Sequence, residues 1–135
     1  MRRIALLAGL LCLIGSAAFA QDPVKVDPQH YTVAFENSQV RVLNIHYGPH
    51  EKSVMHKHPD SVVTFLTDSK VKFTMPDGTS VEQSGKVGDT KWTPAGSHLP
   101  ENLMDTAMDA ILVELKTKPA AKPAAKPAAA KPAAK

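Results

Sequence analysis

Residues 71–89 read VKFTMPDGTSVEQSGKVGD, and this stretch decides the fold class. Apolar and polar residues alternate over residues 71–75, which indicates a strand with one face in solvent. The PDG sequence at residues 76–78 supplies the fixed φ and the left-handed position that a tight turn needs. The GKVGD sequence at residues 85–89 predicts a second turn. Short strands and tight turns of this kind indicate antiparallel β structure.

The same organisation extends over most of the chain in both directions. No segment shows ten or more residues with sustained helical periodicity. Further strands are predicted at residues 31–35, 40–47, 62–66, 91–93, 99–104 and 107–115. Many short strands separated by turns favour an all-β fold, an antiparallel sandwich or jelly-roll barrel.

The N-terminal segment has the layout of an export signal. The chain has 135 residues, enough for one domain with a single core. Residues 1–20 (MRRIALLAGLLCLIGSAAFA) combine a basic start, an apolar run and an Ala-Phe-Ala end, which predicts a cleavable signal peptide and a periplasmic or secreted protein. The alternative is an uncleaved anchor. The only cysteine, Cys12, lies in this segment, so the mature chain would have neither disulfides nor thiolate ligands.

The C-terminal segment is a low-complexity repeat. Residues 118–135 read KPAAKPAAKPAAAKPAAK, and a proline about once per helical turn disfavours a helix. We expect a disordered, extended arm that could reach about 55 Å at ~3.1 Å per residue. Its regularly spaced charges could hold it near an anionic envelope polymer. The alternative is a solubilising tail without a specific partner. Residues 21–117 remain as the expected folded domain.

The charge distribution argues against nucleic acid as a partner. Of 16 basic residues, two lie at the N-terminus and five in the C-terminal repeat. The expected domain therefore holds nine basic and all 13 acidic residues, a net charge of −4. A basic face that could bind nucleic acid is not indicated.

The histidines are the residues that point to chemistry. His56 and His58 are two residues apart, and on a strand that spacing points both imidazoles to one face, about 6.6 Å apart along the chain. His98 follows a Pro-Ala-Gly bend at the start of a predicted strand. The other histidines are expected on the surface or in turns: His30, His46 and His50. For His50 the less favoured alternative is a fourth ligand position.

Several other side chains have two interpretations. Phe73, Met75 and Trp92 are expected in the core, with a place in a pocket wall as the alternative for Trp92. Asn102 could fix a strand by hydrogen bonds or touch a ligand. No Gly-x-Ser-x-Gly nucleophile, phosphate-binding glycine loop or placed carboxylate pair is present, so any chemistry would run through a metal.

Two motifs make the sequence resemble a small single-domain cupin. The first cupin motif is a glycine, five residues, His-x-His, and a glutamate four or five residues later. His56 and His58 match this motif, His50 occupies the glycine position, and the glutamate, due at Val62 or Val63, is absent.

The second cupin motif is a glycine, five residues, Pro-x-Gly, two residues, a histidine, three residues and an asparagine. Residues 88–96 (GDTKWTPAG) match its first part, and His98 and Asn102 keep its last interval. One residue instead of two separates Gly96 from His98. The resemblance covers roughly residues 31–115.

The resemblance implies a jelly-roll barrel that binds a divalent transition metal inside, often iron, zinc, nickel, copper or manganese. His56, His58 and His98 are then the expected metal ligands. Without the glutamate the site is a neutral three-histidine set, which leaves positions open for water or substrate and disfavours magnesium.

Two functions remain open from the sequence. The first is an exported cupin that binds a divalent transition metal and acts on, or senses, a small polar molecule. The alternative is a non-catalytic module that binds a small ligand or associates with the envelope without a metal. Whether the protein is an enzyme is left undecided. Open strand edges make a homodimer an expectation in either case.

Overall fold

The computed structural model of the chain describes residues 22–116. The expected signal peptide and the Lys-Pro-Ala repeat lie outside the described residues, so both stay predictions. Within residues 22–116, no helix has the length and apolar character needed to cross a bilayer.

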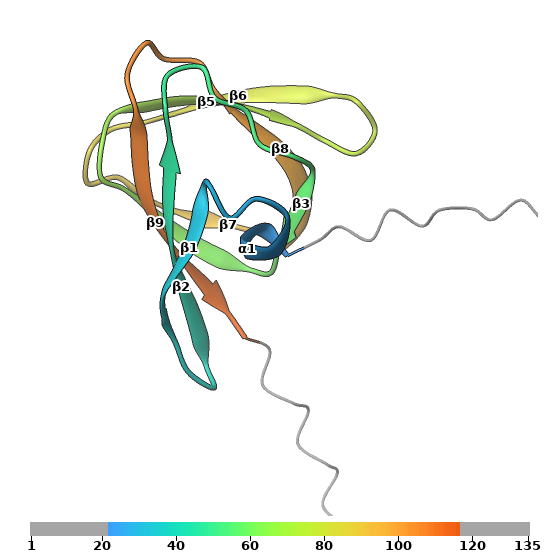
Figure 1. The fold of residues 1–135 in the computed structure, drawn as a ribbon, viewed down its shortest axis with the longest axis vertical. Coiled ribbons are helices and arrows are strands. Elements are labelled where there is room, and N and C mark those ends of the chain that lie inside the picture. Colours follow the sequence, from blue (N-terminus) through green and yellow to red (C-terminus); the bar gives the residue numbers. More distant parts are fainter. Residues whose placement is uncertain (1–21, 117–135) are drawn as a thin grey trace, which may run out of the picture.

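The described residues form one short helix and nine strands (Figure 1). The helix α1 spans Pro23–Val26. The strands are β1 (Tyr31–Glu36), β2 (Val40–Tyr47), β3 (His56–His58), β4 (Ser61–Phe65), β5 (Ser69–Thr74), β6 (Ser80–Gly85), β7 (Thr90–Thr93), β8 (Gly96–Asn102) and β9 (Met108–Leu115).

The strands build two antiparallel sheets that face each other. One sheet has the order β1-β2-β9-β4-β7, and the other has the order β3-β8-β5-β6. Strands distant in sequence are neighbours in both sheets, as β2 and β4 flank β9 and β3 and β5 flank β8. This crossed pairing confirms the predicted all-β, antiparallel jelly roll.

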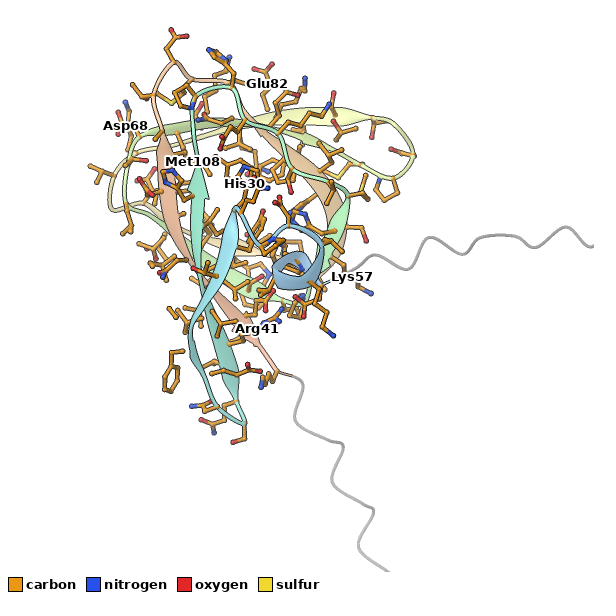
Figure 2. All side chains as sticks on the ribbon, viewed as in Figure 1. His30, Arg41, Lys57, Asp68, Glu82 and Met108 are labelled. Carbon is orange, nitrogen blue, oxygen red and sulfur yellow. The ribbon has the colours of Figure 1, made fainter. Side chains whose placement is uncertain are left out.

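The alternation of side chains decides what lies between the sheets. Along β9 the residues at even numbers are buried, from Met108 through Ala110 and Leu112 to Glu114. Leu43 on β2 pairs with Leu112 and is fully buried. Apolar side chains from both sheets therefore form one core, while charged side chains such as Asp68 and Glu82 lie at the periphery (Figure 2).

The predicted turns are present, and the reason is local backbone geometry. Gly78 has a φ of 85° in the β5–β6 hairpin, where a left-handed residue is required. Asp77 fixes the same hairpin by accepting hydrogen bonds from the backbone and hydroxyl of Thr79, at 2.9 and 2.7 Å. Gly88, also with a φ of 85°, occupies the turn before β7.

Two elements were not predicted from the sequence, and the expected position of one side chain is wrong. Strand β6 was not predicted, because its residues are polar and exposed and show no apolar alternation. Helix α1 was not predicted either, since four residues are too few for a periodic signal. The expectation that Trp92 lies in the core is wrong: its residue is 58% exposed, although it borders the interior cavity.

Candidate metal centre

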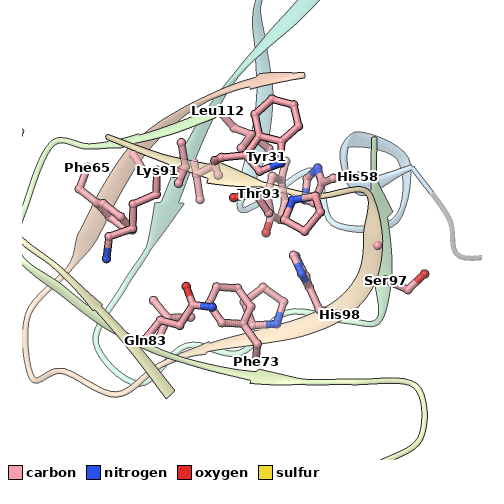
Figure 3. Close-up of a pocket in the computed structure, with 18 of the residues that line it drawn as sticks. Tyr31, His58, Phe65, Phe73, Gln83, Lys91, Thr93, Ser97, His98 and Leu112 are labelled. Carbon is pink, nitrogen blue, oxygen red and sulfur yellow. The ribbon is translucent and has the colours of Figure 1, made fainter. Parts of the chain in front are cut away.

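The pairing of β3 with β8 brings the three predicted histidines together. His56 lies directly opposite His98 in the register, and His58 lies opposite Gly96. The intervening Lys57 is exposed, whereas His56 and His58 are buried, as expected for alternate residues of a strand. His58 and His98 project into the interior between the sheets (Figure 3).

The three imidazoles converge on one point. Their ring centroids are 4.9 Å apart for His56 and His58, 5.1 Å for His56 and His98, and 5.4 Å for His58 and His98. One nitrogen from each ring lies within 4.8 Å of the others. A metal bound at about 2.1 Å needs nitrogens within about 4 Å of one another. Small rotations of the rings would bring the three nitrogens to that spacing. The residue types and their arrangement therefore fit a transition metal.

His56 presents one nitrogen without a partner. Its Nδ1 lies 2.8 Å from the carbonyl oxygen of Val54 and 3.3 Å from Oγ of Ser53. Because a carbonyl only accepts, Nδ1 carries the proton and Nε2 keeps a free lone pair. Among the described residues, that Nε2 is the one buried side-chain nitrogen or oxygen that makes no hydrogen bond.

His58 is oriented by a buried carboxylate. Its Nδ1 donates to Oε1 of Glu114 at 2.6 Å, and both side chains are less than 5% exposed. The guanidinium of Arg41 donates to the other carboxylate oxygen at 2.5 Å. Burial raises the pKa of Glu114, but the hydrogen bonds from His58 and Arg41 outweigh it and leave the pKa below its usual value. Glu114 is therefore ionised, and Nε2 of His58 is free.

Burial keeps His56 and His98 neutral. Burial and the neighbouring His58 lower the pKa of His56 to about 4. Burial and the two neighbouring imidazoles lower the pKa of His98 to about 3. Neutral imidazole is the form that binds a metal, so both rings are in the ligating form at neutral pH.

The missing glutamate of the first motif leaves an apolar position. Val63, one of the two residues where that glutamate would stand, lines the interior cavity. Within residues 22–116, the group that could hold a metal consists of the three histidines alone. Glu114 instead lies behind His58. Sequence reasoning missed it, although its place in the inward series of Ala110 and Leu112 was a usable signal.

The other histidines do not join the cluster. His50 has a φ of 57°, the one positive φ of a non-glycine residue in the described part, and it stands where the cupin motif has glycine. Its ring is 61% exposed and pairs with Asp105, so the fourth-ligand alternative is wrong. His46, 60% exposed, pairs with Asp109.

His30 and Asn102 have structural roles. His30 is not a simple surface residue: it stacks on Tyr47 with centroids 4.2 Å apart and bonds to the carboxylates of Asp27 and Glu51. Asn102 is buried, and its amide donates to the carbonyls of Gly48 and Thr106 at 2.9 and 2.8 Å. The hydrogen-bonding interpretation of Asn102 is therefore confirmed.

A cavity of about 330 Å³ adjoins the histidine cluster between the two sheets (Figure 3). His58 and His98 line it at one end, and its walls include Phe65, Phe73 and Leu112. The ring of Phe73 lies 4.9 Å from that of His98. A metal on the cluster would therefore face an apolar chamber.

Solved structures share this architecture. A cupin domain from Bordetella pertussis Tohama I is 28% identical, with a TM-score of 0.60 over 64% of this chain and 91% of its own. A conserved protein with a double-stranded β-helix domain from Klebsiella pneumoniae subsp. pneumoniae MGH 78578 is 19% identical, with a TM-score of 0.52 over 63% of this chain and 74% of its own. A cupin family protein from Methanocaldococcus jannaschii is 15% identical, with a TM-score of 0.50 over 66% and 83%.

No protein-family profile and no curated protein sequence matches the chain. The solved structures, together with the two crossed antiparallel sheets, nevertheless identify the architecture as the double-stranded β-helix. Residues 22–116 therefore have the cupin fold.

Proposed function

We propose that this protein binds one divalent transition metal through His56, His58 and His98 and presents it to a small molecule in the barrel. The observation that carries the proposal is the buried, unpartnered Nε2 of His56 at the point where the three rings converge. A buried polar atom without a partner costs about 1–3 kcal/mol. A bound metal removes that cost.

The orientation of His58 supports the same proposal. Metal-bound histidines usually donate their second ring nitrogen to a carboxylate or a carbonyl, which fixes the ring and its tautomer. The Glu114 carboxylate acts on His58 in this way, and the Val54 carbonyl does so for His56. Both rings thus have their remaining lone pairs available.

The donor set favours iron, zinc, nickel, copper or manganese. Neutral imidazoles suit these ions, whereas magnesium prefers oxygen ligands. Three protein ligands leave positions for water or a ligand on the side of the cavity. A metal bound there would polarise a carbonyl or hydroxyl oxygen or, in the case of iron, activate dioxygen. Phe73 and the neighbouring apolar walls line that side.

The test is the metal content of the chain purified from the compartment to which it is delivered. The protein is stripped with a chelator, reloaded with each metal in turn, and assayed by elemental analysis. We expect about one metal per chain in the wild type and a loss of nearly all of it in His56→Ala and His98→Ala.

His46→Ala is the matched control, because His46 is exposed and lies outside the cluster. It should retain the wild-type metal content. Equal metal content in the wild type and both cluster variants would refute metal binding at this site. The cavity would then support the second candidate, a ligand-binding module without a metal.

Export and attachment are further parts of the proposal. The composition of residues 1–20 supports delivery to the periplasm or the medium, and the repeat at residues 118–135 supports contact with an anionic envelope polymer. Cell fractionation combined with N-terminal sequencing tests the first, and cleavage after Ala20 is expected. The exposed edge strand β1 supports a homodimer, which light scattering tests.

A further inference from the structure

We propose that the cavity binds a small organic acid with an apolar body, and that Lys91 and Gln83 receive its carboxylate at the end away from the histidines. The inference concerns the interior of the same barrel as the proposed function. It rests on the proposed metal function only for the end of the ligand that would face the histidines.

Lys91 is aimed inward from the edge of one sheet. It pairs with Val63 on β4, which lines the cavity, so the two side chains share the inner face of the sheet. Its ammonium lies 5.4 Å from the centroid of the Phe65 ring. Figure 3 shows the Lys91 side chain beside Phe65, on the opposite side of the cavity from His98.

Among residues 22–116, Lys91 is also the only Lys or Arg that lines this cavity, and no Asp or Glu of that range lines it. Its ammonium donates to the backbone carbonyl of Ser84 at 2.5 Å, and within residues 22–116 it forms no ion pair with a carboxylate. An ammonium has three donors, so two remain for a ligand. A half-buried cation that faces an apolar chamber without a counter-ion favours an anionic ligand.

Gln83 supplies a second donor from the facing sheet. It pairs with Val71 on β5, whose buried side chain lines the cavity, so Gln83 lines the same chamber although its residue is exposed to solvent. β6 and β7 are the edge strands of their two sheets. Lys91 and Gln83 thus face the same chamber from its two opposing walls (Figure 3). A carboxylate between them can accept from an ammonium and an amide.

The rest of the chamber suits an apolar body. Phe65 and Phe73 form opposite walls, and Met75 and Leu112 add to them. The ring of Phe65 is held against Gly85, where an added Cβ would lie 2.6 Å from it. The volume of about 330 Å³ equals roughly eleven water molecules at about 30 Å³ each, which suits an acid with a single ring or a short branched chain.

The experiment measures binding of four acids by isothermal titration calorimetry: benzoate, phenylacetate, 3-phenylpropionate and isovalerate. The full chain is titrated once free of metal and once loaded with zinc, and zinc content is determined separately. Phenylacetamide, the neutral counterpart of phenylacetate, and acetate, which lacks the apolar body, are the ligand controls.

We expect at least one of the four acids to bind the metal-free protein with a Kd below about 1 mM, and phenylacetamide and acetate to bind at least tenfold more weakly. Lys91→Met should weaken binding of that acid at least tenfold, and Lys91→Arg should restore most of it. Lys70→Met is the matched control, since Lys70 is a strand lysine that does not line the cavity.

Binding to none of the four acids at that level would overturn the inference, as would equal binding by wild type and Lys91→Met. Acid binding that requires zinc and ignores Lys91 would also overturn it, since the carboxylate would then be a metal ligand. That last result would leave the proposed metal function intact. Conversely, Lys91-dependent binding by a protein that takes up no zinc on reloading would support the inference and refute the metal site.

Discussion

The six histidines of this domain fall into two sets of three that differ in their surroundings. The outer set is His30, His46 and His50, and the inner set is His56, His58 and His98. Each outer histidine bonds to at least one carboxylate. His30 bonds to Asp27 and Glu51, His46 to Asp109, and His50 to Asp105. In the inner set, only His58 meets a carboxylate, and only through Nδ1.

This difference separates the proposed metal ligands from the structural histidines. His30 has both ring nitrogens bonded to carboxylates, whereas His46 and His50 are exposed and each pairs with a carboxylate through one ring nitrogen. A buried ring with a fixed Nδ1 and a free Nε2 keeps a lone pair available, as His56 does. The distinction lies in the partners that the fold supplies, because the residue type is the same in both sets.

The largest expected effect is on the pH dependence of the metal-free protein. The pKa of His56 falls from the usual 6.5 to about 4 on folding, so the unfolded chain binds a proton more readily. Above pH 6.5 this contribution to stability is fully present, and it is lost as pH falls from 6.5 toward 4. The free energy of unfolding should fall by on the order of 3 kcal/mol for His56 alone, at ~1.4 kcal/mol per pKa unit.

Urea unfolding at several pH values measures this loss. Glu114, with its lowered pKa, adds a further loss only below its ordinary range near 4.5, outside most of this window. The pKa of His98, lowered to about 3, adds a second loss in the same window, so His56→Gln should reduce the slope between pH 6.5 and 4 without abolishing it; His46→Gln is the surface control. A wild-type stability that is constant from pH 6.5 to 4 would contradict the burial of the inner set.

Metal addition should stabilise the folded protein, and this stabilisation should depend on the inner set. Zinc at a hundredfold excess over its Kd should raise the free energy of unfolding by about 2.7 kcal/mol. For a domain of this size, the corresponding rise in Tm is roughly 10–20 °C. Thermal denaturation of His98→Ala should show no such rise, and that of His46→Ala should match the wild type. A similar rise in all three proteins would mean that zinc binds elsewhere.

Removing the carboxylate behind His58 tests whether orientation matters. Glu114→Gln should lower zinc affinity 10- to 100-fold, because His58 loses the charged acceptor that fixes its ring. Asp109→Asn is the matched change in the outer set, where Asp109 meets His46 at 2.7 Å. It should change the affinity less than twofold. Competition with a chromophoric chelator measures both, and equal effects would remove the distinction between the sets.

The smallest effect is expected at Ser53. Its hydroxyl donates to Asp27 and lies 3.3 Å from Nδ1 of His56, which already has the Val54 carbonyl at 2.8 Å. Ser53→Ala should therefore lower zinc affinity only a few-fold, with a loss of stability of about 1 kcal/mol from the buried hydrogen bond. A loss as large as that of Glu114→Gln would show that the Ser53 contact, rather than Val54, orients the ring.

The sequence predicted the inner set because spacing and motif carry that information locally. His-x-His on a strand fixes two rings on one face, and the second motif pointed to His98. The partners could not be read in the same way: His58 and Glu114 are 56 residues apart. The pairing of β4 with β9 sets Ser61, three residues after His58, opposite Glu114. β6 escaped prediction because an exposed edge strand needs no apolar face.

Lys91 is a second residue whose surroundings could not be predicted from the sequence. The second motif spans it, yet only the register with Val63 shows that it faces the interior rather than solvent. His50 is another residue whose conformation the motif did not give. It stands at the glycine position of the first cupin motif, and its backbone is left-handed although the residue is a histidine. Motif agreement thus located the candidate site, and the pairing of strands determined which side chains surround it.

The most direct test is X-ray absorption spectroscopy at the zinc edge of the reloaded full chain. Three imidazole nitrogens at about 2.0–2.1 Å are expected, with one or more oxygen neighbours completing the shell. His56→Ala should reduce the imidazole count or abolish binding. A spectrum dominated by oxygen ligands, or an imidazole count that is unchanged in His56→Ala, would contradict a metal centre built from His56, His58 and His98.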